Sequence, residues 1–134
     1  MTKKGMLLVG HGSKLPHNKE LIEATADMIR NKSSEFVVKT GFMSLNSPSI
    51  EEQLEEFRKE DIDLLVVVPL FLARGMHINR DIPAILGLEE GEKLGEFALN
   101  GKNIPLLYAS PIGSDPLLAD LMLKNAHQVI DENL

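Results

Sequence analysis

Short apolar runs and longer amphipathic stretches alternate along most of the chain. The apolar runs have the length and bounding residues that are typical of buried strands. They predict strands over residues 4–10, 35–44, 62–72 and 104–110. The third run, IDLLVVVPLFL, is apolar at consecutive positions, as expected for a central strand of a parallel sheet that is covered on both faces.

The amphipathic stretches predict the helices. Apolar residues recur at helical spacing over residues 17–32, after residue 47, over residues 77–86 and over residues 116–132. Ser47 is expected at the N-cap of the second helix, with Pro48 at its first helical position. Asp115 and Pro116 repeat this start at the last helix.

The order of these elements, βαβαβαβα, predicts an α/β fold. We expect a doubly wound, four-stranded parallel sheet with helices on both faces, right-handed crossovers and the flavodoxin-like strand order 2-1-3-4. Pro83 is expected to interrupt the short third helix. The glycine-rich segment over residues 87–97 is expected to be a mobile loop. A length of 134 residues suits one domain over residues 1–134.

The last helix has more apolar surface than a surface helix needs. A helix on a globular protein buries one apolar stripe, and here apolar residues cover more than that. They are Leu117, Leu118, Leu121, Met122, Leu123, Ala126, Val129 and Ile130. Two explanations remain open, namely a broad packing face against the sheet or a contact with a second subunit.

Composition narrows the class of function. A net charge of −6 argues against a nucleic-acid partner, which requires a basic surface. The absence of cysteine excludes disulfides and thiolate metal sites. The longest apolar run, residues 64–73, is about half of a membrane span. With no signal-peptide pattern at residues 1–9, we expect a cytoplasmic protein without a membrane partner.

Two histidines follow two strands that the order 2-1-3-4 makes neighbours. His11 comes directly after the first strand and His77 follows the third. Ligands bind at the carboxyl ends of strands in such sheets, and neighbouring strands lie about 5 Å apart. The pair is therefore predicted to meet on one metal ion or one flat ligand. The alternative for His11 is a turn residue, and the alternative for His77 is a residue that begins a helix. His17 and His127 are expected on the surface.

The loop around His11 does not match a nucleotide site. Gly10 and Gly12 allow a sharp turn and a close approach of ligand. The chain contains no phosphate-binding G-x-x-x-x-G-K-[ST] motif, no G-x-G-x-x-G fingerprint, and no G-x-S-x-G around Ser13. These absences predict chemistry that uses no nucleotide.

Polar and cationic residues surround both histidines in the sequence. They are Ser13, Lys14, Arg74, Asn79 and Arg80. Cations at the mouth of a site in an acidic protein favour an anionic, carboxylate-bearing small molecule. Ordinary solvated surface charge is the alternative.

Four stretches together resemble the short form of sirohydrochlorin cobaltochelatase, a family of class II chelatases. They are LLVGHGS, GFMSLNSPSIEEQL, PLFLARGMHINRDIP and ASPIGSDPLLADLML, in that order along nearly the whole chain. The resemblance implies ATP-independent insertion of Co²⁺ into sirohydrochlorin in anaerobic cobalamin biosynthesis. It also implies a homodimer that recreates the cleft of longer, two-domain members.

The resemblance assigns roles to residues of this chain. His11 and His77 would be both the metal ligands and the catalytic residues. Substrate would be bound by Gly10, Gly12, Ser13, Arg74, Gly75, Met76 and Arg80. Several relatives carry a glutamate within the stretch that reads FMSLNSPSI here. Ser44 and Ser47 stand in that region, so a third, carboxylate ligand is left open; Glu51 and Glu52 lie on the following helix.

Other functions remain compatible with these residues. Nickel or iron could replace cobalt, as in the coenzyme F430 and siroheme branches, because ligand type alone does not select the metal. A non-catalytic carrier of tetrapyrrole or metal would need the same site. A purely structural α/β domain would use the histidines as turn residues.

Overall fold

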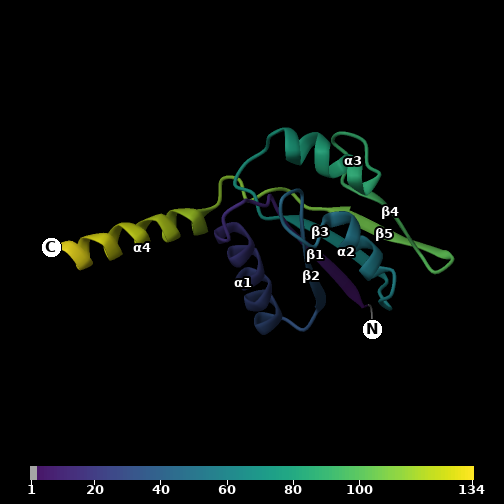
Figure 1. The fold of residues 1–134 in the computed structure, drawn as a ribbon, viewed down its shortest axis with the longest axis horizontal. Helices are drawn as coiled ribbons and strands as arrows, with labels where there is room; N and C mark the ends of the chain where they lie inside the picture. The colour runs from purple at the N-terminus through teal and green to yellow at the C-terminus, as the bar shows by residue number, and fades with distance from the viewer. Residues whose placement is uncertain (1–2) are drawn as a thin grey trace.

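A five-stranded sheet in the order β2-β1-β3-β5-β4 forms the centre of the fold (Figure 1). The structure is a computed structural model that describes residues 3–134, so two residues of the predicted domain, 1 and 2, lie outside the described ones. The strands are β1 (Lys4–Gly10), β2 (Phe36–Phe42), β3 (Leu64–Pro69), β4 (Leu94–Leu99) and β5 (Lys102–Tyr108). The helices are α1 (His17–Lys32), α2 (Ile50–Phe57), the π-helical turn η1 (His77–Asp81), α3 (Ile82–Leu86) and α4 (Pro116–Asn133).

Four strands form the predicted parallel sheet. β1 pairs in parallel with both β2 and β3, and β3 pairs in parallel with β5. Since β5 is the predicted fourth strand, the expected order 2-1-3-4 is confirmed. The carboxyl ends of β1 and β3 lie side by side, with Val9 opposite Pro69.

The fifth strand corrects the prediction of a loop over residues 87–97. β4 runs antiparallel to β5 at the edge of the sheet, joined to it through Asn100 and Gly101, which both have positive φ. Phe97 and Leu99 alternate with exposed residues and are buried. Burial of these two side chains in the core stabilises a strand that the neighbouring glycines and acids obscured in the sequence.

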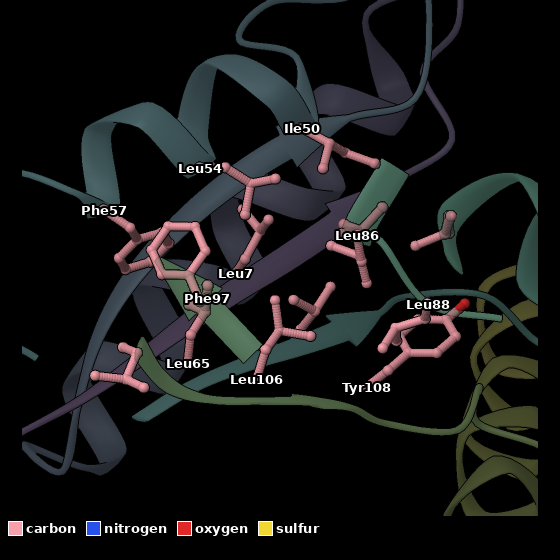
Figure 2. Packing of buried hydrophobic residues seen from close by; sticks show 14 of the residues in the cluster. Leu7, Ile50, Leu54, Phe57, Leu65, Leu86, Leu88, Phe97, Leu106 and Tyr108 are labelled. Atoms are coloured by element: carbon pink, nitrogen blue, oxygen red, sulfur yellow. The ribbon is translucent and has the colours of Figure 1, made fainter. Parts of the chain in front are cut away.

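Helices cover the two faces of the sheet unequally. The larger core lies between the sheet and α2, η1 and α3; in Figure 2, Leu54 and Phe57 of α2 point toward Leu7 and Phe97 of the strands. The smaller core lies under α1 and contains Leu8, Ile22, Ala26, Val38 and Phe42. The sheet face on the α1 side therefore has a helix only over β1 and β2 and the adjoining part of β3.

The start of α2 differs from the prediction. Its N-cap is Ser49 rather than Ser47, and Pro48 precedes the helix instead of beginning it. The Ser49 hydroxyl accepts from the Glu52 amide at 3.0 Å, and the Glu52 carboxylate accepts from the Ser49 amide at 2.9 Å. This reciprocal capping box satisfies two backbone donors, which a cap at Ser47 would leave open.

The predicted helix over residues 77–86 consists of two consecutive segments of different helix type. Its first turn, η1, is π-helical, and the Ile82 amide donates to the His77 carbonyl five residues before it. Pro83 lies near the start of the α-helical part, where its missing N–H costs little. Gly87, with a φ of 76°, ends the helix.

Helix α4 contacts almost nothing. It projects away from the other elements (Figure 1), and none of its residues is buried. Of the two explanations left open by the sequence, packing of this helix on its own sheet is therefore excluded. Asp115 caps it as predicted, with its carboxylate accepting from the Leu117 amide at 2.9 Å. Within residues 3–134, no helix is both long and apolar enough to cross a bilayer.

Candidate metal and substrate site

The structure brings His11 and His77 into direct contact. Their Nε2 atoms lie 3.1 Å apart and their ring centroids 4.7 Å apart, with the ring planes at 71°. His11 follows β1 and His77 follows β3, so the parallel pairing of these strands sets the approach. Both residues are exposed. The edge of the sheet therefore presents two imidazoles to solvent.

The other nitrogen of each ring is already engaged. The Nδ1 atom of His11 lies 3.0 Å from the Gly12 carbonyl oxygen, and Nδ1 of His77 lies 2.9 Å from an oxygen of Asp81. Both oxygens are acceptors, so each Nδ1 carries the proton when the imidazole is neutral. The lone pairs of both Nε2 atoms then face each other.

Two facing lone pairs fit a bound cation. If one ion bound both nitrogens with metal–imidazole bonds of about 2.1 Å, the angle between the two bonds would be about 95°. That angle suits two neighbouring positions of an octahedral ion. Asp81 meets the Nδ1 side of His77 and so orients the ring without reaching the metal. Among residues 3–134, no group of three or more His, Asp or Glu side chains converges on a possible metal position.

Gly12 sets the conformation of the loop that carries His11. Its φ is +91°, and a Cβ atom there would lie 1.8 Å from the Ser44 carbonyl oxygen. Gly10 is also restricted, because a Cβ atom would lie 2.7 Å from Ile22. Only glycine fits at Gly12 without moving the backbone, so this residue is required by packing as well as by the turn.

Two asparagines hold the same loop. The Asn18 side chain accepts from the Gly12 amide, and the Asn46 side chain accepts from the Ser13 amide, both at 2.9 Å. The Ser13 hydroxyl accepts from the Leu15 amide at 3.2 Å. The loop is fixed, and its Gly12, Ser13 and Leu15 amides have partners within the chain.

The predicted substrate residues after β3 are exposed. Arg74 donates to the Ser110 hydroxyl at 3.4 Å, and Arg80 approaches the Met76 sulfur at 3.9 Å. Met76 is 59% exposed, and a Cβ atom on Gly75 would meet nothing within 4 Å. These residues leave an open surface beside His77.

The possible third ligands lie elsewhere. Ser44 is near the His11 backbone, with its hydroxyl 3.5 Å from the His11 carbonyl. The Ser47 carbonyl accepts from Lys19. Glu52 is used in the α2 cap, where hydrogen bonds from Ser49 lower the pKa of its carboxyl group. Glu51 is exposed on the first turn of α2.

Comparison with known proteins identifies the family of this chain. The CbiX family matches residues 5–129. The chain belongs to the CbiX family. The resemblance to short-form cobaltochelatases is thereby confirmed at the level of the family.

Named relatives cover this CbiX-family chain almost completely. The sirohydrochlorin cobaltochelatase of Methanosarcina acetivorans is 45% identical over 97% of this chain and 100% of its own length. The enzyme of the same name from Methanococcoides burtonii is 40% identical over 96% and 98%.

Solved structures share the fold. A putative cobalamin biosynthesis CbiX protein from Marinobacter aquaeolei has a TM-score of 0.67 at 22% identity, covering 98% of this chain and 99% of its own. The sirohydrochlorin chelatase SirB from Bacillus subtilis, in complex with cobalt, has a TM-score of 0.59 at 30% identity. That match covers 64% of this chain and 37% of SirB, so this chain corresponds to a part of the longer protein.

Several site residues of this CbiX-family protein were not predicted. Asp81 lies four residues after His77, a helical spacing that could have identified it. Phe71, whose ring centroid is 6.0 Å from that of His11, lies within the apolar run before the loop. Asn18 and Asn46 act through tertiary contacts, for which the sequence gives no signal. His17 and His127 are exposed, as expected.

Proposed function

We propose that this CbiX-family protein inserts Co²⁺ into sirohydrochlorin without using a nucleotide. One observation carries the proposal: the Nε2 atoms of His11 and His77 lie 3.1 Å apart at an exposed edge of the sheet. The names of the relatives from Methanosarcina acetivorans and Methanococcoides burtonii support this substrate and this metal. The reaction exchanges one divalent cobalt ion for two pyrrole protons.

The two histidines are proposed to hold the metal substrate and to receive protons. Neutral imidazole is a good ligand for Co²⁺ and also a base near neutral pH. The Gly12 carbonyl and the Asp81 carboxylate keep Nδ1 protonated, so both Nε2 lone pairs are available. As cobalt moves onto the macrocycle nitrogens, the freed Nε2 atoms accept the displaced protons.

The macrocycle is proposed to lie against the exposed surface around His77. Gly75 leaves this surface flat, and Met76 offers an apolar contact. Arg74 and Arg80 supply positive charge for substrate carboxylates. In the His11 loop, Gly10 and Gly12 are buried and would act by fixing the shape of the loop rather than by touching the substrate. The Ser13 side chain of this loop would lie beside the substrate. The Gly12 and Ser13 amides already have partners, so the proposal assigns the anion contacts to the side chains.

A direct test compares Co²⁺, Ni²⁺ and Fe²⁺ in one spectrophotometric assay with metal-free sirohydrochlorin. We expect repeated turnover, with the highest kcat/KM for Co²⁺. A higher value for nickel or iron would assign the protein to one of those branches. A single equivalent of product per protein molecule, with tight binding of both ligands, would indicate a carrier.

We further propose a homodimer built through α4. The exposed large apolar residues of this helix are Leu117, Leu121, Met122, Leu123, Val129 and Ile130. Fully burying one such side chain contributes about 1.5–3 kcal/mol before the costs of association. We propose a second copy of this chain as the partner of α4, because the chain also has an uncovered sheet face on which α4 of another copy could pack.

That open face lies over β4 and β5, on the side of the sheet that α1 occupies. Leu94 and Leu107 are paired across these strands and are 62% and 37% exposed. Glu96, Asn103 and Pro105 line a hollow of about 440 Å³ beside them. Each copy has one uncovered helix and one uncovered sheet face. Reciprocal exchange of α4 about a two-fold axis would cover both.

Light scattering tests this arrangement. The wild type is expected at twice the chain mass of 14.8 kDa. Replacing both Leu121 and Val129 with aspartate should give a folded monomer, whereas Leu21→Asp on exposed α1 should leave the dimer intact. A monomeric wild type would contradict the dimer, and a dimeric double variant would contradict the role of α4.

The remaining parts of the proposal concern location and partners. The acidic chain and the absence of membrane-spanning helices within residues 3–134 fit a cytoplasmic enzyme of small molecules. We propose no nucleic-acid and no membrane partner. Addition of ATP should leave the rate of cobalt insertion unchanged.

A further inference from the structure

Two cationic side chains converge on one hydroxyl group beside the histidine pair. Arg74 donates to the Ser110 Oγ atom at 3.4 Å, and the Lys93 ammonium group donates to the same atom at 3.1 Å. Arg74 precedes η1, Lys93 precedes β4 and Ser110 follows β5, so three separate segments supply the cluster. Sequence analysis identified only Arg74.

Among the described residues, neither Arg74 nor Lys93 forms an ion pair with a carboxylate. Within residues 3–134, the ion pairs closer than 4.0 Å join other lysines and arginines to carboxylates and do not include Arg74 or Lys93. Glu92, next to Lys93, instead accepts from the Glu89 amide at 2.6 Å. Like charges held together without an anion favour binding of one.

The backbone around the cluster is fixed by the sheet. The Tyr108 amide donates to the Lys93 carbonyl at 2.8 Å, and the Ala109 amide donates to the Val67 carbonyl at 2.9 Å. The Tyr108 hydroxyl donates to the Ile78 carbonyl at 2.9 Å, and Tyr108 is buried. Lys93 and Ser110 therefore lie next to hydrogen-bonded strands, which lowers the entropy lost when a ligand binds.

The cluster lines a pocket that adjoins the metal-binding turn. Its walls include Arg74, Ile78, Lys93 and Ser110. Glu92 also lines it, and its carboxylate accepts from the Glu89 amide. Ile78 directly follows His77, so this pocket and the His77 imidazole belong to the same turn. A ligand group in the pocket would be attached to a molecule that reaches the metal.

We infer that Arg74, Lys93 and Ser110 form a subsite for one carboxylate of the tetrapyrrole. The inference rests on the proposed function, since it names the part of that substrate that binds here. The Arg74 fork and the Lys93 ammonium would each donate to a carboxylate oxygen, and the Ser110 hydroxyl would turn from acceptor to donor. Lys93 and Ser110 are substrate-positioning residues that orient the macrocycle over the histidines.

The experiment measures binding of metal-free sirohydrochlorin to the full-length protein by fluorescence titration. Lys93→Met keeps the aliphatic length of the side chain and removes the charge; it is expected to weaken binding about tenfold, as loss of a charge-assisted hydrogen bond does. Ser110→Ala should have a smaller effect in the same direction. Lys32→Met, which removes an exposed charge from the last turn of α1, is the matched control and should bind as the wild type does.

Two further measurements separate positioning from loss of fold. Lys93→Met should bind Co²⁺ alone as the wild type does and should raise KM for sirohydrochlorin much more than it lowers kcat. With the carboxylates of the substrate converted to methyl esters, the wild type and Lys93→Met should bind equally, because the partner charge is gone.

Each outcome decides between the two proposals. A wild type that binds and metallates sirohydrochlorin, with Lys93→Met unchanged in binding, would overturn the subsite and leave the chelatase intact. If Lys93→Met binds sirohydrochlorin more weakly and the wild type performs no metal insertion, the subsite would be supported and the chelatase overturned. A wild type that does not bind sirohydrochlorin would overturn both.

Discussion

The Nε2 atoms of His11 and His77 lie 3.1 Å apart, although 66 residues separate them in the chain. The contact exists because β1 and β3 are parallel neighbours, and each histidine comes after the carboxyl end of its strand. With both Nδ1 atoms hydrogen-bonded to acceptors, the pair presents two lone pairs to one ion. This relationship gives the most direct prediction about the metal.

Replacing either His11 or His77 with alanine should weaken Co²⁺ binding at least about a hundredfold, because one imidazole cannot replace a two-point site. Isothermal titration calorimetry at pH 8 measures this, and circular dichroism should show an unchanged fold. His17→Ala is the control and should bind cobalt normally.

Asp81→Asn tests the residue that orients His77. The amide oxygen can still accept the Nδ1 proton, but it lacks the negative charge that makes the imidazole a better ligand. Cobalt affinity should fall about tenfold, and Asp81→Ala should fall further, within the 10–100-fold range for such supporting residues. Asp61→Asn, at an exposed position before β3, should bind cobalt normally. Equal affinity in all three variants would show that the carboxylate does not support the ligand.

Gly12→Ala should destabilise the fold by about 2–4 kcal/mol, because its φ is positive and the new Cβ atom would overlap the Ser44 carbonyl. Urea denaturation followed by circular dichroism measures the free energy of unfolding. Gly75→Ala is a matched control, since a Cβ atom there meets nothing within 4 Å, and its stability should change by less than about 0.5 kcal/mol. Similar losses in both variants would contradict the role of the close approach at Gly12.

Tyr108 predicts a loss of stability at alkaline pH. Burial raises the pKa of the Tyr108 hydroxyl from 10.0 to about 12, against a smaller opposing effect of the Arg74 charge. The folded state therefore holds this proton more tightly than the unfolded state does. Its contribution to the free energy of unfolding is complete below pH 10 and is lost as pH rises through about 12.

Urea titrations between pH 8 and pH 12 check this behaviour. Tyr108→Phe should be less stable than the wild type near neutral pH by about 1 kcal/mol, because the hydrogen bond to the Ile78 carbonyl is lost. The difference between the two proteins should shrink toward pH 12. A constant difference over the whole range would show that Tyr108 does not titrate in the unfolding transition.

Most of the fold followed from local patterns. An apolar run ending in glycine identified β1, and the long apolar run over residues 62–72 identified β3, which ends at Pro69. Alternation of strand and helix gave the parallel order that brings His11 to His77. The edge strand β4 was missed because only Phe97 and Leu99 mark its buried face, within a segment rich in glycine and acid. The cap at Ser49 was missed because Ser47 and Pro48 match the same start pattern two residues earlier.

The site was less predictable than the sheet. The histidines follow strands, so topology alone places them, whereas Asn18, Asn46, Lys93 and Ser110 act through contacts between distant segments. Helix α4 shows the same limit. Its apolar residues were evident in the sequence, but local pattern could not tell a helix that packs on its own sheet from one that stands free.

The proposed site has a consequence for the direction of the reaction. Two imidazoles would leave most positions of an octahedral ion to water, and such an ion would exchange its ligands readily. A tetrapyrrole offers four nitrogens in a rigid ring, so transfer from protein to macrocycle runs thermodynamically downhill. A site with more side-chain donors would retain the metal ion, whereas a site with two imidazoles would release it to the macrocycle.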